Sequence, residues 1–169
     1  DVMSREVRSV TPETSLADAV EMLIGKAYKA LPVIDRDRRV VGILTDGDVL
    51  ARLGLPDAGV QAALTHAELG RELEALRHSG QTVAGVMVRP VLTIEEDAPL
   101  AAAVRLMTQR GIKRLPVVDK AGRLTGLVSR VDVLRALAQP PVAEAPEQVL
   151  RPGRHARVAD VMVSNVPTV

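Results

Sequence analysis

Hydrophobic and polar positions follow one succession of patterns that occurs twice along this chain. In each half, a short apolar stretch precedes a segment whose apolar side chains recur at i, i+3, i+4 and i+7, the spacing of one helix face. Two short runs of Val, Ile and Leu follow, separated by polar or small residues as in a β-hairpin. A second, shorter helical pattern closes the half. Each half therefore predicts the order β-α-β-β-α, with a mixed sheet and helices over one face.

The predicted elements occupy matching positions in the two halves. The opening strands are 7–10 and 91–94, the hairpin strands are 31–34 with 40–44 and 115–118 with 124–128, and the closing helices start at Asp48 and Asp132. The apolar faces of the first helices consist of Leu16, Ala19, Val20 and Leu23, and of Leu100, Ala103, Val104 and Met107. This correspondence indicates one supersecondary unit present in two copies.

The two copies are also alike residue by residue. The segment 29–35, Lys-Ala-Leu-Pro-Val-Ile-Asp, returns at 113–119 as Lys-Arg-Leu-Pro-Val-Val-Asp, an offset of 113 − 29 = 84 residues. The register holds without a gap over about fifty positions. A unit of roughly 50 to 55 residues buries too little surface to be secure alone. We therefore expect the copies to pack together, to share one core and to place a functional site between them.

Two segments outside the copies have a character of their own. Residues 55–81 form an insertion whose apolar spacing predicts an amphipathic helix, broken near Gly70. Residues 139–156 begin with a Pro-rich stretch that is typical of a linker.

The end of the chain repeats the motif found at its beginning. Val161 and Met162 realign with Val2 and Met3, so the segment 157–169 is predicted to start a third copy. The alternative is a coincidental Val-Met pair in a tail. The predicted divisions of the chain are 1–54, 55–81, 82–138, 139–156 and 157–169.

Composition narrows the functions that fit this chain. Tyr28 is the only aromatic residue, whereas single-stranded nucleic-acid binding usually relies on aromatic stacking. The net charge of +1 gives no basic footprint for a DNA duplex. Nucleic acid is therefore disfavoured as a partner. The absence of cysteine excludes a disulfide framework, a thiol catalyst and a thiolate metal site.

Composition also bears on location. A chain without cysteine fits an intracellular protein, and we expect a cytoplasmic one. No apolar run approaches the roughly 20 residues that cross a bilayer. The sequence begins at Asp1 rather than Met, so we expect a piece of a longer protein, with any regulated domain outside it.

The motifs shared by the two copies are specific in combination. Each copy has a Val-Met opening, a helix, an h-P-V-h-D strand (h, apolar), a Gly nine residues after the Val of that strand, and a T/S-x-x-D segment. This constellation closely resembles the CBS domain, and two in tandem resemble a CBS pair, or Bateman module. The resemblance implies an α+β fold in which two repeats pack about a pseudo-twofold axis. It also implies two clefts that bind AMP, ADP, ATP or S-adenosylmethionine in many members, no catalysis, and association into homodimers.

The resemblance also implies which residues line the two clefts. One cleft would combine Thr45 and Asp48 with Ile112, Lys113, Arg114 and Pro116. The other would combine Ser129 and Asp132 with Tyr28, Lys29, Ala30 and Pro32. No metal ligand and no required cofactor is implied.

The chemistry of the T/S-x-x-D residues agrees with that assignment. The two oxygens of a carboxylate accept hydrogen bonds from neighbouring ribose hydroxyls, which suits Asp48 and Asp132. A hydroxyl at the start of a helix suits phosphate, which is the role expected of Thr45 and Ser129. The alternative is that all four residues only cap their helices. One Asp can both cap a helix and bind a ligand.

Three classes of function follow from these features. The first is a regulatory module that binds an adenosine-containing ligand and passes its state to an attached domain. The second is a structural module for dimerisation or spacing that has no physiological ligand. An enzyme is the weakest, because the sequence has no Ser-His-Asp set, no P-loop and no paired His ligands.

Overall fold

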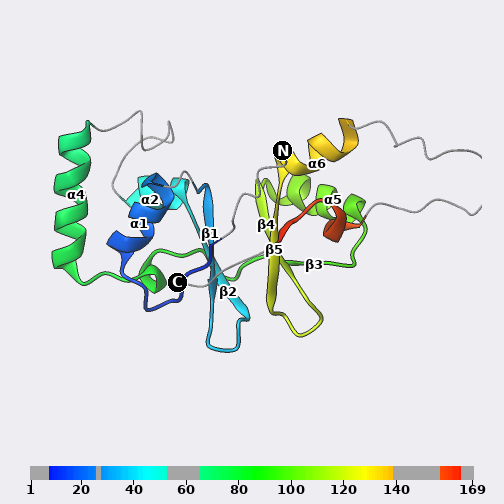
Figure 1. Cartoon of the computed structure of the whole chain (residues 1–169), viewed down its shortest axis with the longest axis horizontal. Coiled ribbons are helices and arrows are strands. Elements are labelled where there is room, and N and C mark those ends of the chain that lie inside the picture. Colours follow the sequence, from blue (N-terminus) through cyan, green and yellow to red (C-terminus); the bar gives the residue numbers. More distant parts are fainter. Residues whose placement is uncertain (1–7, 26–27, 53–64, 139–156, 165–169) are drawn as a thin grey trace, which may run out of the picture.

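The fold consists of two repeats that lie side by side. The computed structural model describes residues 8–25, 28–52, 65–138 and 157–164, and everything below refers to these residues. In Figure 1 the strands of both repeats run roughly parallel in the middle of the molecule, with helices at one end and hairpin turns at the other. Helix and strand are mixed in each repeat, which confirms the predicted α+β fold.

The elements of the two repeats correspond one to one. Repeat 1 contains α1 (Leu16–Gly25), β1 (Ala30–Ile34), β2 (Val40–Thr45) and α2 (Asp46–Arg52). Repeat 2 contains β3 (Ile94–Glu95), α5 (Leu100–Arg110), β4 (Arg114–Val118), β5 (Leu124–Ser129) and α6 (Arg130–Ala138). In each repeat the two long strands pair antiparallel, while the opening segment pairs parallel to the first of them. The mixed sheet is therefore confirmed.

The opening strands and the closing helices have boundaries that differ from the predicted ones. The opening strands are short, a single bridge at Val10 and the two-residue β3, because the chain turns into the first helix soon afterwards. The closing helices start at Asp46 and Arg130, two residues before the predicted Asp48 and Asp132. They start early because Thr45 and Ser129, the last residues of β2 and β5, already occupy the capping positions.

In the described part of the insertion, residues 65–81, the chain forms one uninterrupted helix, α4 (His66–Ser79), that packs against α1. The predicted break near Gly70 is wrong, since a single glycine weakens a helix without ending it. A Thr65–Glu68 capping box starts α4, and Gly80 ends it in the left-handed conformation. Leu76 is buried against the core of repeat 1. No helix in the described part of the chain is long and apolar enough to cross a membrane.

Each repeat has a hydrophobic cluster of its own, so the expectation of one shared core is wrong. Leu31, Val33 and Leu44 are fully buried in the first cluster, and Leu115, Val117 and Val128 in the second. Each cluster also includes residues from the segment that follows its repeat. These are Val83 and Met87 in the first cluster and Val158 in the second.

The Val-Met segment that opens a repeat completes the sheet of the preceding repeat. On repeat 1, the N–H groups of Val83 and Ala84 donate to the carbonyls of Thr14 (2.9 Å) and Pro12 (3.0 Å), and Val88 pairs with Ile43. On repeat 2, Val158 and Ala159 donate to Ala98 and Glu96, both at 2.9 Å, and β6 (Val163–Ser164) pairs with β5. The two acceptor residues on repeat 1 and their counterparts on repeat 2 are 84 residues apart, and the corresponding donor residues are 158 − 83 = 75 residues apart. Since both offsets are constant, the two segments dock in the same way. That 157–169 starts a third repeat stays a prediction, and Val2 and Met3 lie outside the described residues.

The glycine of the shared motif leaves room for this docked segment. A Cβ atom at Gly42 would lie 2.6 Å from the Sδ atom of Met87 and 3.3 Å from the carbonyl oxygen of Val88. Only glycine lets the next Val-Met segment approach this closely. The spacing between the strand Val and this Gly is thus set by packing rather than by a ligand.

The aspartate of h-P-V-h-D holds the hairpin turn of each repeat. The Oδ1 atom of Asp35 accepts from the backbone N–H groups of Asp37 and Arg39, both at 2.9 Å. Asp119 accepts in the same way from Ala121 and Arg123. The N–H of Arg123 is the main cause that lowers the pKa of the Asp119 carboxyl. These carboxylates are therefore structural.

The two repeats are joined at these hairpins. Arg39 and Arg123, equivalent residues at an offset of 84, form an antiparallel bridge. The N–H of Val40 donates to the carbonyl of Gly122 (3.2 Å), and that of Leu124 donates to Arg38 (2.9 Å). The two donors, Val40 and Leu124, are equivalent residues of the two repeats, and so are the two acceptors, Arg38 and Gly122. The bonds are therefore related by a pseudo-twofold axis through the bridge, as the fold class predicts.

We expect the hairpins to differ in strain. Arg38 has φ 64° and its equivalent Gly122 has φ 79°, a region that costs a side-chain-bearing residue about 1–2 kcal/mol. Arg38→Gly relieves this strain, but glycine also has more conformational entropy to lose on folding. The net stabilisation should therefore be about 0.5–1 kcal/mol. Gly122→Ala should destabilise by about 1 kcal/mol. Urea unfolding of both variants measures this, and a loss of stability in Arg38→Gly would contradict it.

We expect Gly42→Ala to destabilise the protein by about 1–3 kcal/mol, because the added methyl overlaps the Met87 side chain. The matched control is Gly70→Ala in the interior of α4, where nothing lies within 4 Å and the change should be neutral or stabilising. In thermal unfolding, Met87→Ala should recover part of the loss in the double variant. Strict additivity of the two changes would show that the close approach is not the cause.

Candidate functional site

The two T/S-x-x-D segments lie at equivalent corners of the fold, where a strand passes directly into a helix. Thr45 is the last residue of β2, and α2 starts at the next residue. Ser129 is the last residue of β5, and α6 starts at the next residue. Both corners lie at the end of the sheets opposite the hairpins (Figure 1).

Each segment forms a reciprocal cap. The Oδ2 atom of Asp48 accepts from the backbone N–H and the hydroxyl of Thr45, both at 2.7 Å, and the N–H of Asp48 donates to the Thr45 hydroxyl at 3.3 Å. In repeat 2, Asp132 Oδ2 accepts from the N–H (2.9 Å) and hydroxyl (2.6 Å) of Ser129, and its N–H donates back at 3.2 Å. Thr45 and Ser129 are thus the N-cap residues, and the aspartates lie in the first turn rather than at the cap.

The cap uses only one oxygen of each aspartate. Within the described residues, no hydrogen bond is made by the Oδ1 atom of Asp48 or of Asp132. Both side chains are half-buried, so these oxygens reach the surface while their orientation is fixed. Capping a helix and accepting a hydrogen bond from a ligand are therefore compatible in the same carboxylate.

The strand register sets which other site residues lie near each cap. Ala30 is the antiparallel partner of Thr45, and Arg114 is the partner of Ser129, so each h-P-V strand lies beside the motif of its own repeat. Across the junction, β2 contacts β4. Grouping Thr45 with 112–116 and Ser129 with 28–32 in two clefts stays a prediction.

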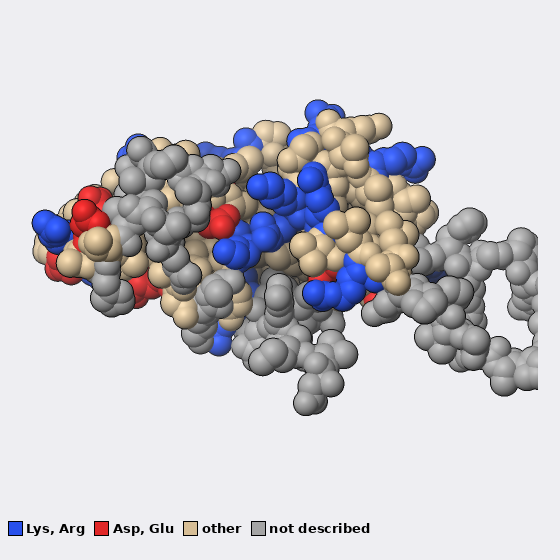
Figure 2. Space-filling view, turned by 90° about the horizontal axis from the view of Figure 1, so that it is seen from above, with Lys and Arg blue, Asp and Glu red and all other residues tan. Residues whose placement is uncertain are grey.

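Basic side chains gather at this end of the molecule. Figure 2 views it from above and shows Lys and Arg side chains over the middle of the face, where the repeats adjoin. Lys29 and Lys113 directly precede β1 and β4, Arg114 begins β4, and Arg130 begins α6. The corner of each repeat is therefore a suitable surface for an anion.

The two corners differ in charge at the first helical residue. Repeat 1 has Asp46, whose carboxylate lies 3.9 Å from the Lys29 ammonium. Repeat 2 has Arg130, whose backbone N–H donates to the Lys113 carbonyl (2.9 Å) and whose guanidinium reaches the Ile112 carbonyl (3.5 Å). Positive charge is thus greater at Ser129 than at Thr45. This difference in charge can be found from the sequence alone, because aligning the two repeats places Asp46 opposite Arg130.

The remaining predicted site residues are partly used by the fold. Pro32 and Pro116 are buried in β1 and β4, opposite Ile43 and Leu127. The Pro32 carbonyl accepts from the N–H of Val10 at 3.0 Å. Tyr28 is half-buried and packs against the first hydrophobic cluster. These contacts fix the walls of the corners.

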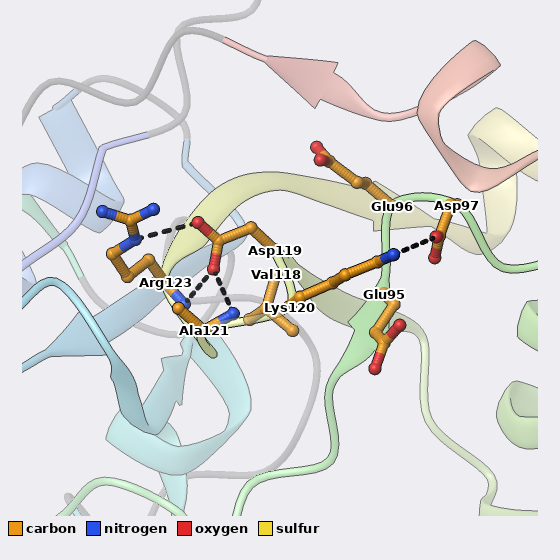
Figure 3. A pocket seen from close by; sticks show the side chains of 8 residues that line it. All are labelled: Glu95, Glu96, Asp97, Val118, Asp119, Lys120, Ala121 and Arg123. Carbon is orange, nitrogen blue, oxygen red and sulfur yellow. Dashed lines mark hydrogen bonds and ion pairs between the residues drawn. The ribbon is translucent and has the colours of Figure 1, made fainter.

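Two cavities lie elsewhere, at equivalent places beside the hairpins. One, of about 300 Å³, is lined by 95–97, 118–121 and Arg123 (Figure 3), and its counterpart on repeat 1 has about 340 Å³. In Figure 3, Lys120 reaches Asp97 (3.9 Å) and Asp119 is held by its turn. None of the predicted site residues lines either cavity. In the described residues, no group of three or more His, Asp or Glu side chains is placed to hold a metal ion.

Comparison with known proteins identifies a family. The family model of the CBS domain matches residues 1–55 and 83–139. CBSX2, a chloroplastic CBS domain-containing protein of Arabidopsis thaliana, is 33% identical over 138 residues, which cover 77% of this chain and 58% of CBSX2. The chain thus spans little more than half of that relative.

Solved structures give the same result. A crystal structure of CBSX2 in complex with AMP has a TM-score of 0.59 and 34% identity, covering 78% of this chain and 87% of that one. The CBS domain pair of protein MJ0100, in complex with 5′-methylthioadenosine and S-adenosyl-L-methionine, has a TM-score of 0.57 and 26% identity, covering 81% and 92%.

We expect the cap to separate two effects of mutating Asp48. Asp48→Ala removes the acceptor of the Thr45 N–H and hydroxyl and should destabilise repeat 1 by about 1 kcal/mol. Asp48→Asn keeps one accepting oxygen and should cost only a few tenths of a kcal/mol. Urea unfolding compares the two, and equal losses would contradict the reciprocal cap.

Proposed function

The chain belongs to the CBS-domain family as a tandem pair, and from this membership we propose that its two T/S-x-x-D corners bind an adenosine-containing ligand. The observation that supports the proposal best is the Oδ1 atom of Asp48 and of Asp132 that the cap leaves without a hydrogen bond, at corners where basic residues precede or begin the neighbouring elements in both halves. The relatives agree in chemistry, because AMP, 5′-methylthioadenosine and S-adenosyl-L-methionine share an adenosine group.

In this proposal different residues contact the ribose, the phosphate and the adenine of the ligand. Asp48 and Asp132 accept hydrogen bonds from the ribose hydroxyls through Oδ1. The hydroxyls of Thr45 and Ser129 contact a phosphate or an equivalent polar group. The adenine lies against the segments that precede and begin the h-P-V strands, which are Tyr28, Lys29, Ala30 and Pro32 on one side and Ile112, Lys113, Arg114 and Pro116 on the other.

Charge distinguishes the two corners in this proposal. Arg130 follows Ser129 at the start of α6, whereas Asp46 follows Thr45 at the start of α2 and lies 3.9 Å from Lys29. A ligand with several phosphates therefore prefers the corner at Ser129. A ligand with little negative charge discriminates less between them.

The role of the pair is regulatory rather than catalytic. A ligand that contacts both repeats favours one relative arrangement of them about the Arg39–Arg123 junction. An attached domain then responds by the difference in ligand affinity between the two arrangements.

A second candidate function, a dimerisation or spacing module without a physiological ligand, is favoured by one observation. Val131, Leu134 and Leu137 of α6 are 56%, 59% and 67% exposed, and they form an apolar stripe. Such a stripe suits a homodimer interface. Dimer formation and ligand binding are compatible, so only a folded dimer without ligand affinity supports this candidate alone.

We expect calorimetric titration of the chain with AMP, ADP, ATP and S-adenosylmethionine to detect two binding sites. Asp48→Asn and Asp132→Asn keep a capping oxygen but lose the charged acceptor, so each should weaken one site about tenfold or more and leave the other intact. Asp37→Asn, an exposed hairpin carboxylate, is the matched control and should change nothing. No heat with any of the four compounds, from a folded chain, would contradict the proposal.

A further inference from the structure

The strand that ends in each T/S-x-x-D corner has a second neighbour besides its hairpin partner. Val88 pairs with Ile43 on β2, two residues before Thr45, through hydrogen bonds of 2.8 and 3.3 Å. In repeat 2, β6 pairs with Gly126 and Leu127, the latter two residues before Ser129. In both repeats the docked segment thus lies beside the ligand corner of the repeat that precedes it in sequence.

From this arrangement we propose that each corner transmits its ligand state to the segment that follows its repeat. The corner at Thr45 acts on 82–88, and the corner at Ser129 acts on 157–164. Each corner is coupled to one segment, the one that follows its repeat in the chain. The inference rests on the proposed function, because it needs a ligand at the two corners.

Cross-strand rows connect each corner to its docked segment. In repeat 1, Pro32, Ile43 and Val88 form one row, and the row two residues further towards the corner, on the same face of the sheet, pairs Ala30 with Thr45. In repeat 2, Pro116, Leu127 and Val163 occupy the equivalent row, two residues along the strand from the pair of Arg114 and Ser129. A ligand that fixes the end of β2 or β5 therefore orders the strand to which the docked segment is hydrogen-bonded.

The docked segments fit their places closely enough to follow a shift of the strand. Val83 and Val158 are fully buried and Met87 is 8% exposed. Met87 also fills the space that a Cβ at Gly42 would take. Closely packed interfaces of this kind move as a unit rather than deforming gradually.

Chain order determines which segment each corner is coupled to. The segment 82–88 belongs by sequence to the start of repeat 2 but is packed into the core of repeat 1. A ligand at Thr45 thus acts on the chain that enters repeat 2. The segment 157–164 is packed on repeat 2 in the same way, so a ligand at Ser129 acts on whatever chain follows it.

The first test is amide hydrogen exchange of the full chain with and without saturating AMP. The Val88 N–H reports the first docked segment, and those of Val158 and Ala159 report the second. We expect AMP to slow exchange of both by about 5-fold or more, the lower end of typical coupling between sites. In Thr45→Ala/Asp48→Ala only the second segment should respond, and in Ser129→Ala/Asp132→Ala only the first. Comparing each variant with and without AMP removes the effect of the lost cap.

The second test uses the absence of cysteine in the sequence. Leu127→Cys with Val163→Cys introduces one disulfide across β5 and β6, at residues that are register partners. Because coupling between two sites is reciprocal, locking the docked segment should increase the affinity for AMP at the Ser129 corner about 5-fold and leave the affinity at the Thr45 corner unchanged. The same chain with the disulfide reduced is the control. If AMP binds but does not change the exchange rates, and if its affinity is equal in the locked and reduced chains, the proposed coupling between corner and segment is wrong. The proposed function would then remain intact. Failure of AMP, ADP, ATP and S-adenosylmethionine to bind would overturn both.

Discussion

The interaction on which the rest of this structure depends is the docking of each Val-Met segment onto the repeat before it. A single β-α-β-β-α unit leaves the outer edge of its last strand unpaired and one side of its core open. Val83 and Met87 close repeat 1, and Val158 closes repeat 2. The repeats are therefore linked in series, each completed by residues that sequence alone assigns to its successor. This explains how units of roughly 50 residues, too small to be secure alone, each keep a core of their own.

Local polar residues then give the unit its fixed corners. The aspartate of h-P-V-h-D holds the hairpin turn, and the aspartate of T/S-x-x-D caps the helix that follows the last strand of the unit. Both use side-chain oxygens to satisfy backbone N–H groups that the regular elements leave unpaired. The second aspartate differs because one of its oxygens stays open beside basic side chains. In the proposed function a structural cap and a ligand-binding group are combined in one residue, and the cap orients the carboxylate in advance.

Pseudo-symmetry organises the pair without making its halves equal. The bridge between Arg39 and Arg123 places the repeats about one axis, and the hydrogen bonds beside it are exact counterparts. Away from the axis the repeats have diverged. Asp46 stands where repeat 2 has Arg130, and α4 covers α1 while the α6 face stays exposed. Equivalent geometry with different charge is the basis on which the two corners are proposed to favour different ligands.

The sequence by itself determined the repeat, the order of elements, the hairpins and the T/S-x-x-D corners, because these depend on local periodicity and on residues a few positions apart. It also placed Asp48 and Asp132 among the candidate site residues, although their exact position in the helix depended on which residue took the cap. Only the tertiary structure decided that the Val-Met segments join the preceding sheet and that the cores are separate. It also showed that Gly42 leaves the space that the Met87 side chain occupies. Strand pairing over long separations leaves no periodic signal within either segment, so a repeated Val-Met marks the segment without telling which sheet receives it.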